Sequence, residues 1–129
     1  MEIALRALVL RALADDPVLS AELNSITEEA PARASLPWLA LVASASVDWS
    51  HKTGEGREIR LAIELQCRGD DPATASGLVR RIEEVIAGLA KNQPDFTIAS
   101  VLFLRARTQQ RLPATRAVLI EHRFRLLAA

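Results

Sequence analysis

The stretch from Glu58 to Arg68 alternates between apolar and mainly polar side chains, and this alternation constrains the fold more than any other feature of the sequence. Successive side chains of a β-strand point to opposite faces of a sheet. A period-two pattern over about ten residues therefore predicts a strand with one buried face. Its apolar set is Ile59, Leu61, Ile63, Leu65 and Cys67. A second alternating set, expected to form the preceding strand, is Leu39, Leu41, Ala43, Ala45 and Val47.

The segment from Asp48 to Glu58 connects these two predicted strands. We predict a long loop here, because the segment exceeds a tight hairpin turn and carries chemically varied side chains. Long loops of this kind commonly carry function. We interpret the loop as a contact surface for assembly, without a catalytic role. The candidate contact residues in it are Trp49, Ser50, His51, Lys52, Thr53 and Arg57.

Three helices are predicted from apolar spacing and capping signals. Residues 2–14 have helical apolar spacing, and Asp16 followed by Pro17 ends that helix and begins a short one that continues to about Leu23. Residues 24–37 form a polar connector that could include a brief extended piece. An acidic pair before Pro72, Asp70 and Asp71, predicts the start of the third helix. Its apolar stripe, expected to lie across the sheet, is Leu78, Ile82, Val85, Ile86 and Leu89.

Two more strands are predicted, within residues 96–107 and 115–127. In the first, we assign Phe96, Ile98, Leu102 and Leu104 to one face and Val101 and Phe103 to the other. In the second, the residues that share a face are Val118, Ile120, His122, Phe124 and Leu126. We expect a loop from Thr108 to Ala114 between them.

These elements predict one α+β domain over residues 1–129. Its expected architecture is a four-stranded, mostly antiparallel sheet, with an N-terminal helix and a central helix packed on it and a long β-hairpin loop. Some apolar side chains fall on the nominal outer face of the sheet: Val101, Phe103 and Leu119. Either a partner protein or the N-terminal helix would cover them.

The composition is that of a soluble globular protein, with 50% apolar and 25% charged residues. No apolar run approaches the ~18 residues that a membrane-spanning helix needs. The N-terminus also lacks a signal-peptide layout, so we expect synthesis in the cytoplasm and no membrane partner. The single cysteine, Cys67, is expected to be a buried thiol.

Charge is unevenly distributed although the net charge is zero. Residues 1–37 carry three arginines and six acids, whereas residues 100–129 carry six arginines and one acid, Glu121. If these segments occupy different sides of the fold, identical copies could meet head to tail with complementary charge. A solvated charge distribution without a partner is the alternative. The arginines that we expect at a subunit or partner interface are Arg105, Arg107, Arg111 and Arg116.

No motif predicts an enzyme, a cofactor site or a metal site. Asp48, Ser50 and His51 have the residue types of a hydrolase triad, but triad members usually come from separated segments. His51, His122 and Cys67 do not have the spacing of zinc ligands. We expect the glycine pair Gly54 and Gly56 to permit positive backbone angles at the loop tip.

Nucleic-acid binding is a weaker alternative. Arg105 with Arg107, and Arg123 with Arg125, could form a basic stripe, since residues two apart on a strand share a face. The stripe lacks interleaved aromatic residues for base stacking, and the chain has no tyrosine. Pairing of these arginines with acids of a neighbouring subunit is the interpretation that we favour.

The sequence resembles tail terminator (tail completion) proteins of long-tailed, siphovirus-type phages and gene transfer agents. The hairpin run that carries the resemblance is Asp48-Trp49-Ser50-His51-Lys52-Thr53-Gly54-Glu55-Gly56-Arg57-Glu58-Ile59-Arg60-Leu61. The likeness extends to Asp16-Pro17-Val18-Leu19 after the opening helix, Ile26–Pro31, Pro37-Trp38, Ala75–Leu89, Val101–Arg107 and Phe124-Arg125-Leu126. Residues 24–36 depart from the pattern, because they lack the glycine expected in that connector.

The resemblance implies a small α+β subunit, assembled into the neck or tail of a phage or phage-like particle. Six copies would form a ring that caps the head-proximal end of the tail tube, ends its polymerisation and joins it to a head-side stopper or connector. DNA would pass through the lumen without sequence-specific binding. The hairpin loop would reach a neighbouring subunit, the tube or the neck, with Trp49 as an anchor or packed on its own sheet. Alternatives are another neck component, a small nucleic-acid-binding module and, more distantly, a hydrolase.

Overall fold

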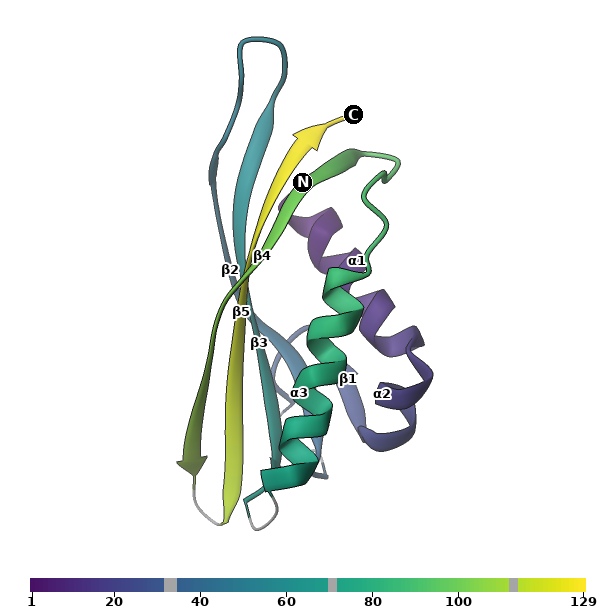
Figure 1. Ribbon diagram of the computed structural model, residues 1–129, viewed down its shortest axis with the longest axis vertical. Coiled ribbons are helices and arrows are strands. Elements are labelled where there is room, and N and C mark those ends of the chain that lie inside the picture. Colours follow the sequence, from purple (N-terminus) through teal and green to yellow (C-terminus); the bar gives the residue numbers. More distant parts are fainter. Residues whose placement is uncertain (32–34, 70–71, 112–113) are drawn as a thin grey trace.

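Five strands form one sheet in the order β1-β2-β3-β5-β4, and the helices lie on one of its faces (Figure 1). A computed structural model describes residues 1–31, 35–69, 72–111 and 114–129. The elements are α1 (Glu2–Asp15), α2 (Pro17–Glu22), β1 (Ser25–Thr27), β2 (Trp38–Asp48), β3 (Gly56–Arg68), α3 (Pro72–Ala87), β4 (Phe96–Arg111) and β5 (Thr115–Ala128). The α+β class is as predicted.

The sheet has five strands instead of the predicted four. The additional strand, β1, has three residues and pairs in parallel with the start of β2, where Ile26 lies opposite Leu39. It occupies the position of the brief extended piece considered in the connector. Three residues are too few to show an alternating pattern, so the sequence did not establish it as a strand. All other strand pairs are antiparallel.

The predicted loop from Asp48 to Glu58 is shorter in the structure, because Asp48 belongs to β2 and residues 56–58 belong to β3. Asp48 still pairs with Arg57, and the Trp49 amide donates to the Gly56 carbonyl over 2.9 Å. The chain reverses in a tight turn whose ends, His51 and Gly54, exchange two backbone hydrogen bonds. The resulting hairpin projects well past the helices, at the top of Figure 1. Backbone hydrogen bonds continue toward the tip, which side-chain patterns do not reveal.

A β-bulge between Leu41 and Ala43 corrects the predicted faces of β2. Before the bulge, Leu39 and Leu41 lie opposite Leu65 and Ile63 and are buried. A bulge inserts one residue, so every later side chain changes face. The residues predicted to share the buried face but found on the opposite face are Ala43, Ala45 and Val47.

Two bulges also change which face the later side chains of β4 occupy. One lies between Ile98 and Ser100 and the other between Phe103 and Arg105. Phe103 pairs with the buried His122 and lies on the helix side with Phe96, whereas Leu102 lies on the other side. The predicted grouping of Phe96 with Leu102 was therefore wrong. The predicted start of the next loop, at Thr108, was also wrong, because β4 continues to Arg111. Residues 112–113 lie outside the described part of the chain.

Both long helices pack on the same face of the sheet (Figure 1). Leu5, Val9 and Leu13 of α1 are fully buried, and the predicted stripe of α3 joins them in one hydrophobic core. The alternative in which the N-terminal helix covers the other face is therefore wrong. The predicted helix start at Asp70 and Asp71 falls outside the described residues.

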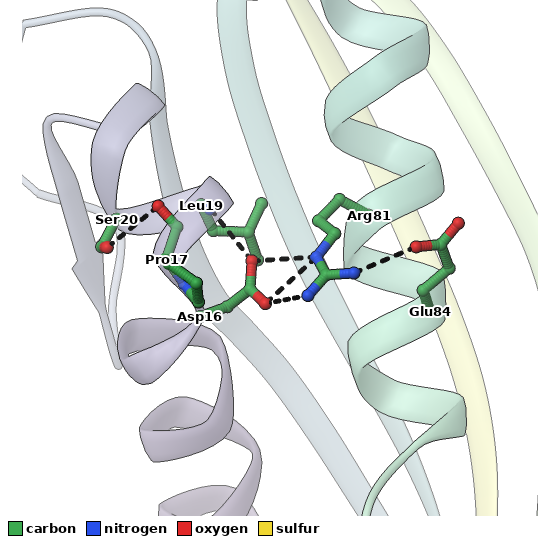
Figure 2. Close-up of polar contacts among 6 residues, drawn as sticks. All are labelled: Asp16, Pro17, Leu19, Ser20, Arg81 and Glu84. Atoms are coloured by element: carbon green, nitrogen blue, oxygen red, sulfur yellow. Dashed lines mark hydrogen bonds and ion pairs between the residues drawn. The ribbon is translucent and has the colours of Figure 1, made fainter.

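The junction of α1 and α2 confirms the predicted capping by Asp16 and adds a contact with α3. The Asp16 carboxylate accepts a hydrogen bond from the Leu19 amide over 3.1 Å, and Pro17 takes the first turn of α2. The same carboxylate holds the Arg81 guanidinium, whose Nη1 also donates to Glu84 over 3.2 Å (Figure 2). This ion pair lowers the pKa of Asp16.

A candidate assembly surface

The sheet face away from the helices carries most of the charge of β3, β4 and β5. We call it the open face; its charged residues are Glu58, Arg60, Glu64, Arg68, Arg105, Arg107, Arg111, Glu121, Arg123 and Arg125. Ion pairs cross its strands: Arg125 contacts Glu58 over 3.0 Å, and Arg111 contacts Glu64 over 3.4 Å. Several of the cations thus have an acid partner within the chain.

Arg105 and Arg107 share the open face, as predicted, but their surroundings differ. Arg105 donates to both carboxylate oxygens of Glu121, over 3.0 and 3.1 Å. This pairing lowers the pKa of Glu121 and raises that of Arg105. Arg107 is exposed beside it, opposite Leu119. Arg107 therefore presents its charge outward more freely than Arg105 does.

Arg116 does not lie with these arginines. It pairs with Cys67 in the ladder and faces the helix side of the sheet, where its Nη2 donates to the Gly69 carbonyl over 3.4 Å. Its Nε is buried and has no hydrogen-bond partner among the described residues. Arg116 thus lies on the other face of the sheet from Arg105, Arg107 and Arg111.

Trp49 is half-buried near the hairpin tip and packs on its own chain. Its ring meets the His51 ring edge-on, with 4.6 Å between centroids, and the Arg125 guanidinium lies 5.4 Å from its centroid. Arg125 belongs to β5, so a cation–π contact joins the tip to the body of the sheet. His51, Lys52 and Thr53 are exposed at the turn. The tip is thus an exposed projection with a partly available aromatic ring.

Ser50 has a structural position in this tip. Its Oγ donates to Asp48 Oδ1 over 2.6 Å and accepts from the Gly56 amide over 3.1 Å. Within the described residues no hydrogen bond joins Ser50 to His51, whose ring packs against Trp49. The geometry of these three side chains therefore differs from that of a catalytic triad, in which the histidine accepts the serine proton.

Gly56 is required by close approach of two backbones. A Cβ placed there would lie 2.4 Å from the Trp49 carbonyl oxygen and 2.9 Å from that of Leu126. None of the described glycines has a positive φ, so the predicted role of Gly54 and Gly56 in positive backbone angles was wrong. At Gly54 a Cβ would meet nothing within 4 Å.

The two edges of the sheet, at β4 and at β1, differ in charge. The β4 side carries Arg105, Arg107 and Arg111, with no acid in that strand. The opposite side is formed by α1, α2, β1 and the residues after β1. Its exposed charged residues within the described ranges are four acids, Asp15, Glu22, Glu28 and Glu29, and one arginine, Arg11. The sheet order places β1 and β4 at opposite edges. The uneven charge of the sequence therefore becomes a separation in space.

The described residues contain no group of three or more histidine, cysteine, aspartate or glutamate side chains that could hold a metal ion. Burial lowers the pKa of His122 to about 4 and raises that of Cys67. None of the helices in the described ranges is long and apolar enough to cross a membrane. The prominent features are thus surfaces: the open face, two unlike edges and a projecting hairpin.

Comparison with known proteins places this fold in a family. One solved chain with a similar fold comes from a structure titled "Virion of native gene transfer agent (GTA) particle". Its TM-score is 0.76 and its sequence identity 22%, over 95% of this chain and 94% of that one. None of the curated proteins matches this chain in sequence. The profile of the family described as "Tail completion protein gp17" matches residues 7–127, nearly the whole chain, so the protein belongs to the tail completion protein gp17 family.

Proposed function

We propose that this protein is a structural subunit of a phage or phage-like particle, where a ring of six copies caps the head-proximal end of the tail tube. The ring ends tube polymerisation and provides the surface on which the head-side stopper or connector docks. Membership of the tail completion family supports this role. The fold shared with a chain of a gene transfer agent particle is consistent with it.

The observation that carries the proposal is the separation of unlike edges across one sheet. A cationic edge at β4 and an acidic side at α1 and β1 can meet only between different copies. Such a contact uses two different patches and is heterologous, so it closes into a ring when the rotation permits. Complementary charge would also orient each incoming copy. Arg107 and Arg111 would contribute to this contact.

The hairpin would act at one end of the ring. It extends beyond the helices and carries an exposed turn above a half-buried tryptophan (Figure 1). Trp49 has the properties of an interface anchor, because aromatic residues bury a large area at small entropic cost. We assign the residues from Trp49 to Thr53, together with Arg57, to contact with the tube, the neck or a neighbouring subunit.

DNA would pass through the lumen without being read. Arg105, Arg123 and Arg125 already contact Glu121 or Glu58 within the chain, which lowers the positive charge available to phosphates. A sequence-reading nucleic-acid module would need free donors directed at base edges. The ion pairs therefore favour an assembly subunit over that alternative.

Mass measurement tests ring formation directly. We expect monomer to convert to a hexamer when purified tail-tube protein is added, and to do so without DNA. Raising the salt concentration should weaken this conversion, because screening acts on exposed charges. A persistent monomer in the presence of assembled tubes would contradict the proposal.

A tip-shortened variant tests the hairpin. Replacing His51–Gly54 by an Asn-Gly turn should leave a folded subunit, since the pairing of Asp48 with Arg57 lies outside the change. We expect tubes of uncontrolled length or heads without tails in particle images. The matched control is Glu55→Gln, an exposed position of the same hairpin outside the assigned contact set; it retains the turn length and should give normal particles. Normal particles from the shortened variant would remove the hairpin from the mechanism.

A further inference from the structure

Helix α1 has an apolar stripe on its outer side as well as on its core side. The outer stripe consists of Ile3, Ala7, Leu10 and Ala14, whose spacings of four, three and four residues place them on one helical face. Ile3 is 74% exposed. Together with Arg11, Ile26 and Glu28, the stripe lines a shallow hollow of about 440 Å³. Apolar residues on both sides are typical of a helix that is covered on both sides.

A groove lies on the other side of the molecule, between α3 and strand β4. It consists of two adjoining hollows of about 640 and 240 Å³, which share Glu83 and Ala87. Its apolar lining comes from α3 and from the helix side of β4 and β5: Ala75, Val79, Val101, Phe103, Ala106 and Val118. Phe103 is 44% exposed there. Among the described residues, no helix covers this part of β4.

Two buried polar atoms on the groove lining have no hydrogen-bond partner within the described chain. They are His122 Nδ1 and Arg116 Nε. Buried polar atoms in native proteins are nearly always hydrogen-bonded, and each exception calls for an explanation. His122 is 3% exposed. Both atoms are almost closed to solvent in the single subunit, so a neighbour's side chains would not reach them; the side chain that a segment in the groove would cover is the half-exposed Phe103.

We infer that the groove receives helix α1 of a neighbouring copy, an inference that rests on the proposed ring. The outer stripe of α1 lies at the β1 side of the sheet and the groove at the β4 side, so one copy cannot bring them together. At about 1.5 Å per residue, α1 would span ~21 Å and α3 ~24 Å, so the two lengths match. Small residues in both surfaces, such as Ala7 and Ala87, allow the helices to approach closely. The helical layer would then run continuously around the ring.

Charge and direction agree with this packing. Helices α1 and α3 run in roughly opposite directions (Figure 1). When the ring axis is parallel to these helices, the rotation that relates two copies leaves the direction of α1 unchanged. The neighbour's α1 therefore lies antiparallel to α3. The exposed Asp15 at the end of that α1 then approaches Arg116 at the corresponding end of the groove. Ile3 comes to lie near Ala87, and Ala14 near Ser76.

Disulfide cross-linking of assembled rings tests the contact. The first double variant is Ile3→Cys with Ala87→Cys, and the second is Ala14→Cys with Ser76→Cys; all four positions are exposed in the subunit. Native Cys67 is 2% exposed and stays in place. On oxidation each double variant should form covalent oligomers up to the closed ring. Each single variant should stay monomeric under denaturing conditions, because a heterologous contact joins two different positions.

The mismatched pair, Ile3→Cys with Ser76→Cys, is the matched control and should not cross-link. Rings that form while neither matched pair cross-links would overturn this inference and leave the proposed function intact. Cross-linking of only the mismatched pair would overturn the antiparallel arrangement. Absence of rings for the unmodified chain would defeat the proposed function, and this inference with it.

A blocking substitution gives an independent measurement. Ala7→Arg places a long side chain on the outer stripe, where the subunit exposes it, so the melting temperature should not change. The ring association constant should fall at least about tenfold, which corresponds to about 1.4 kcal/mol. Ala45→Arg on the open face of β2, an exposed position away from both the stripe and the groove, is the control and should assemble normally. Unchanged assembly of Ala7→Arg would overturn the inference.

Discussion

Asp16 joins two parts of the protein that lie 65 residues apart, because its carboxylate caps α2 and also holds the guanidinium of Arg81 on α3 (Figure 2). The carboxylate is buried, whereas Arg81 is partly exposed and extends to Glu84. A buried carboxylate needs both hydrogen bonds and a countercharge. The contact therefore fixes the angle between α1 and α2 and the position of both against α3.

Substitution of Asp16 should separate its two roles. Asp16→Asn retains an oxygen for capping but loses the charge, whereas Asp16→Ala loses both. We expect Asp16→Ala to be the less stable by about 1 kcal/mol in urea unfolding. Arg81→Gln should resemble Asp16→Asn. Equal stabilities of the Ala and Asn variants would show that the cap contributes nothing.

The buried His122 should make the isolated subunit lose stability in mild acid. Its pKa is about 4 in the folded chain against 6.5 when unfolded, so the unfolded state binds the extra proton between these values. Stability is thus fully present above pH 6.5 and falls as the pH decreases to about 4. At about 1.4 kcal/mol per pKa unit, the loss should reach up to roughly 3 kcal/mol.

Urea unfolding at several pH values checks this slope. His122→Phe should remove most of the pH dependence of the unfolding free energy between pH 6.5 and about 4.5. The lower limit is chosen because Asp16 and Glu121, whose pKa values are lowered, titrate below it. His51→Gln is the control, because His51 is exposed at the hairpin turn and should leave the slope unchanged. A slope that persists in His122→Phe would contradict the assignment.

Two glycines of one hairpin should respond differently to alanine. Gly56→Ala places a methyl group against two backbone carbonyls that cannot move independently of their strands, so it should destabilise by about 1–3 kcal/mol. Gly54→Ala meets open space and should stay within ~0.5 kcal/mol of the parent. Thermal unfolding of both variants measures the difference, and similar melting temperatures would refute it.

Cys67 should be chemically silent in the folded subunit. Its side chain on β3 is buried, and this burial raises the pKa of the thiol. Little reactive thiolate is therefore present at pH 7. A thiol reagent such as DTNB should react at least about 100-fold more slowly than in urea, since reaction requires opening of the structure. Fast labelling of the folded chain would contradict this burial.

Much of the fold was predictable because it depends on local chemistry. The alternation from Ile59 to Cys67 predicted β3, and Asp16 with Pro17 predicted the junction of α1 and α2. The buried register of Val118, Ile120, Phe124 and Leu126 in β5 was predicted and is confirmed. Each of these patterns depends on residues within one element, where backbone geometry alone sets the spacing.

The tertiary structure decided which face each side chain occupies beyond a bulge and which surfaces remain uncovered. The shift after Leu41 moved Val47 away from the core, and the shifts in β4 moved Phe103 toward the helices. Backbone pairing also shortened the predicted loop at both of its ends, at Asp48 and from Gly56 onward. The pattern of apolar and polar residues does not show where the pairing of two strands shifts by one residue, because the position of a bulge depends on the backbone hydrogen bonds of both strands. The sequence by itself determined the elements and the uneven charge. Only the tertiary structure separated that charge to opposite edges and left a stripe of α1 and a groove beside α3 uncovered in the single subunit.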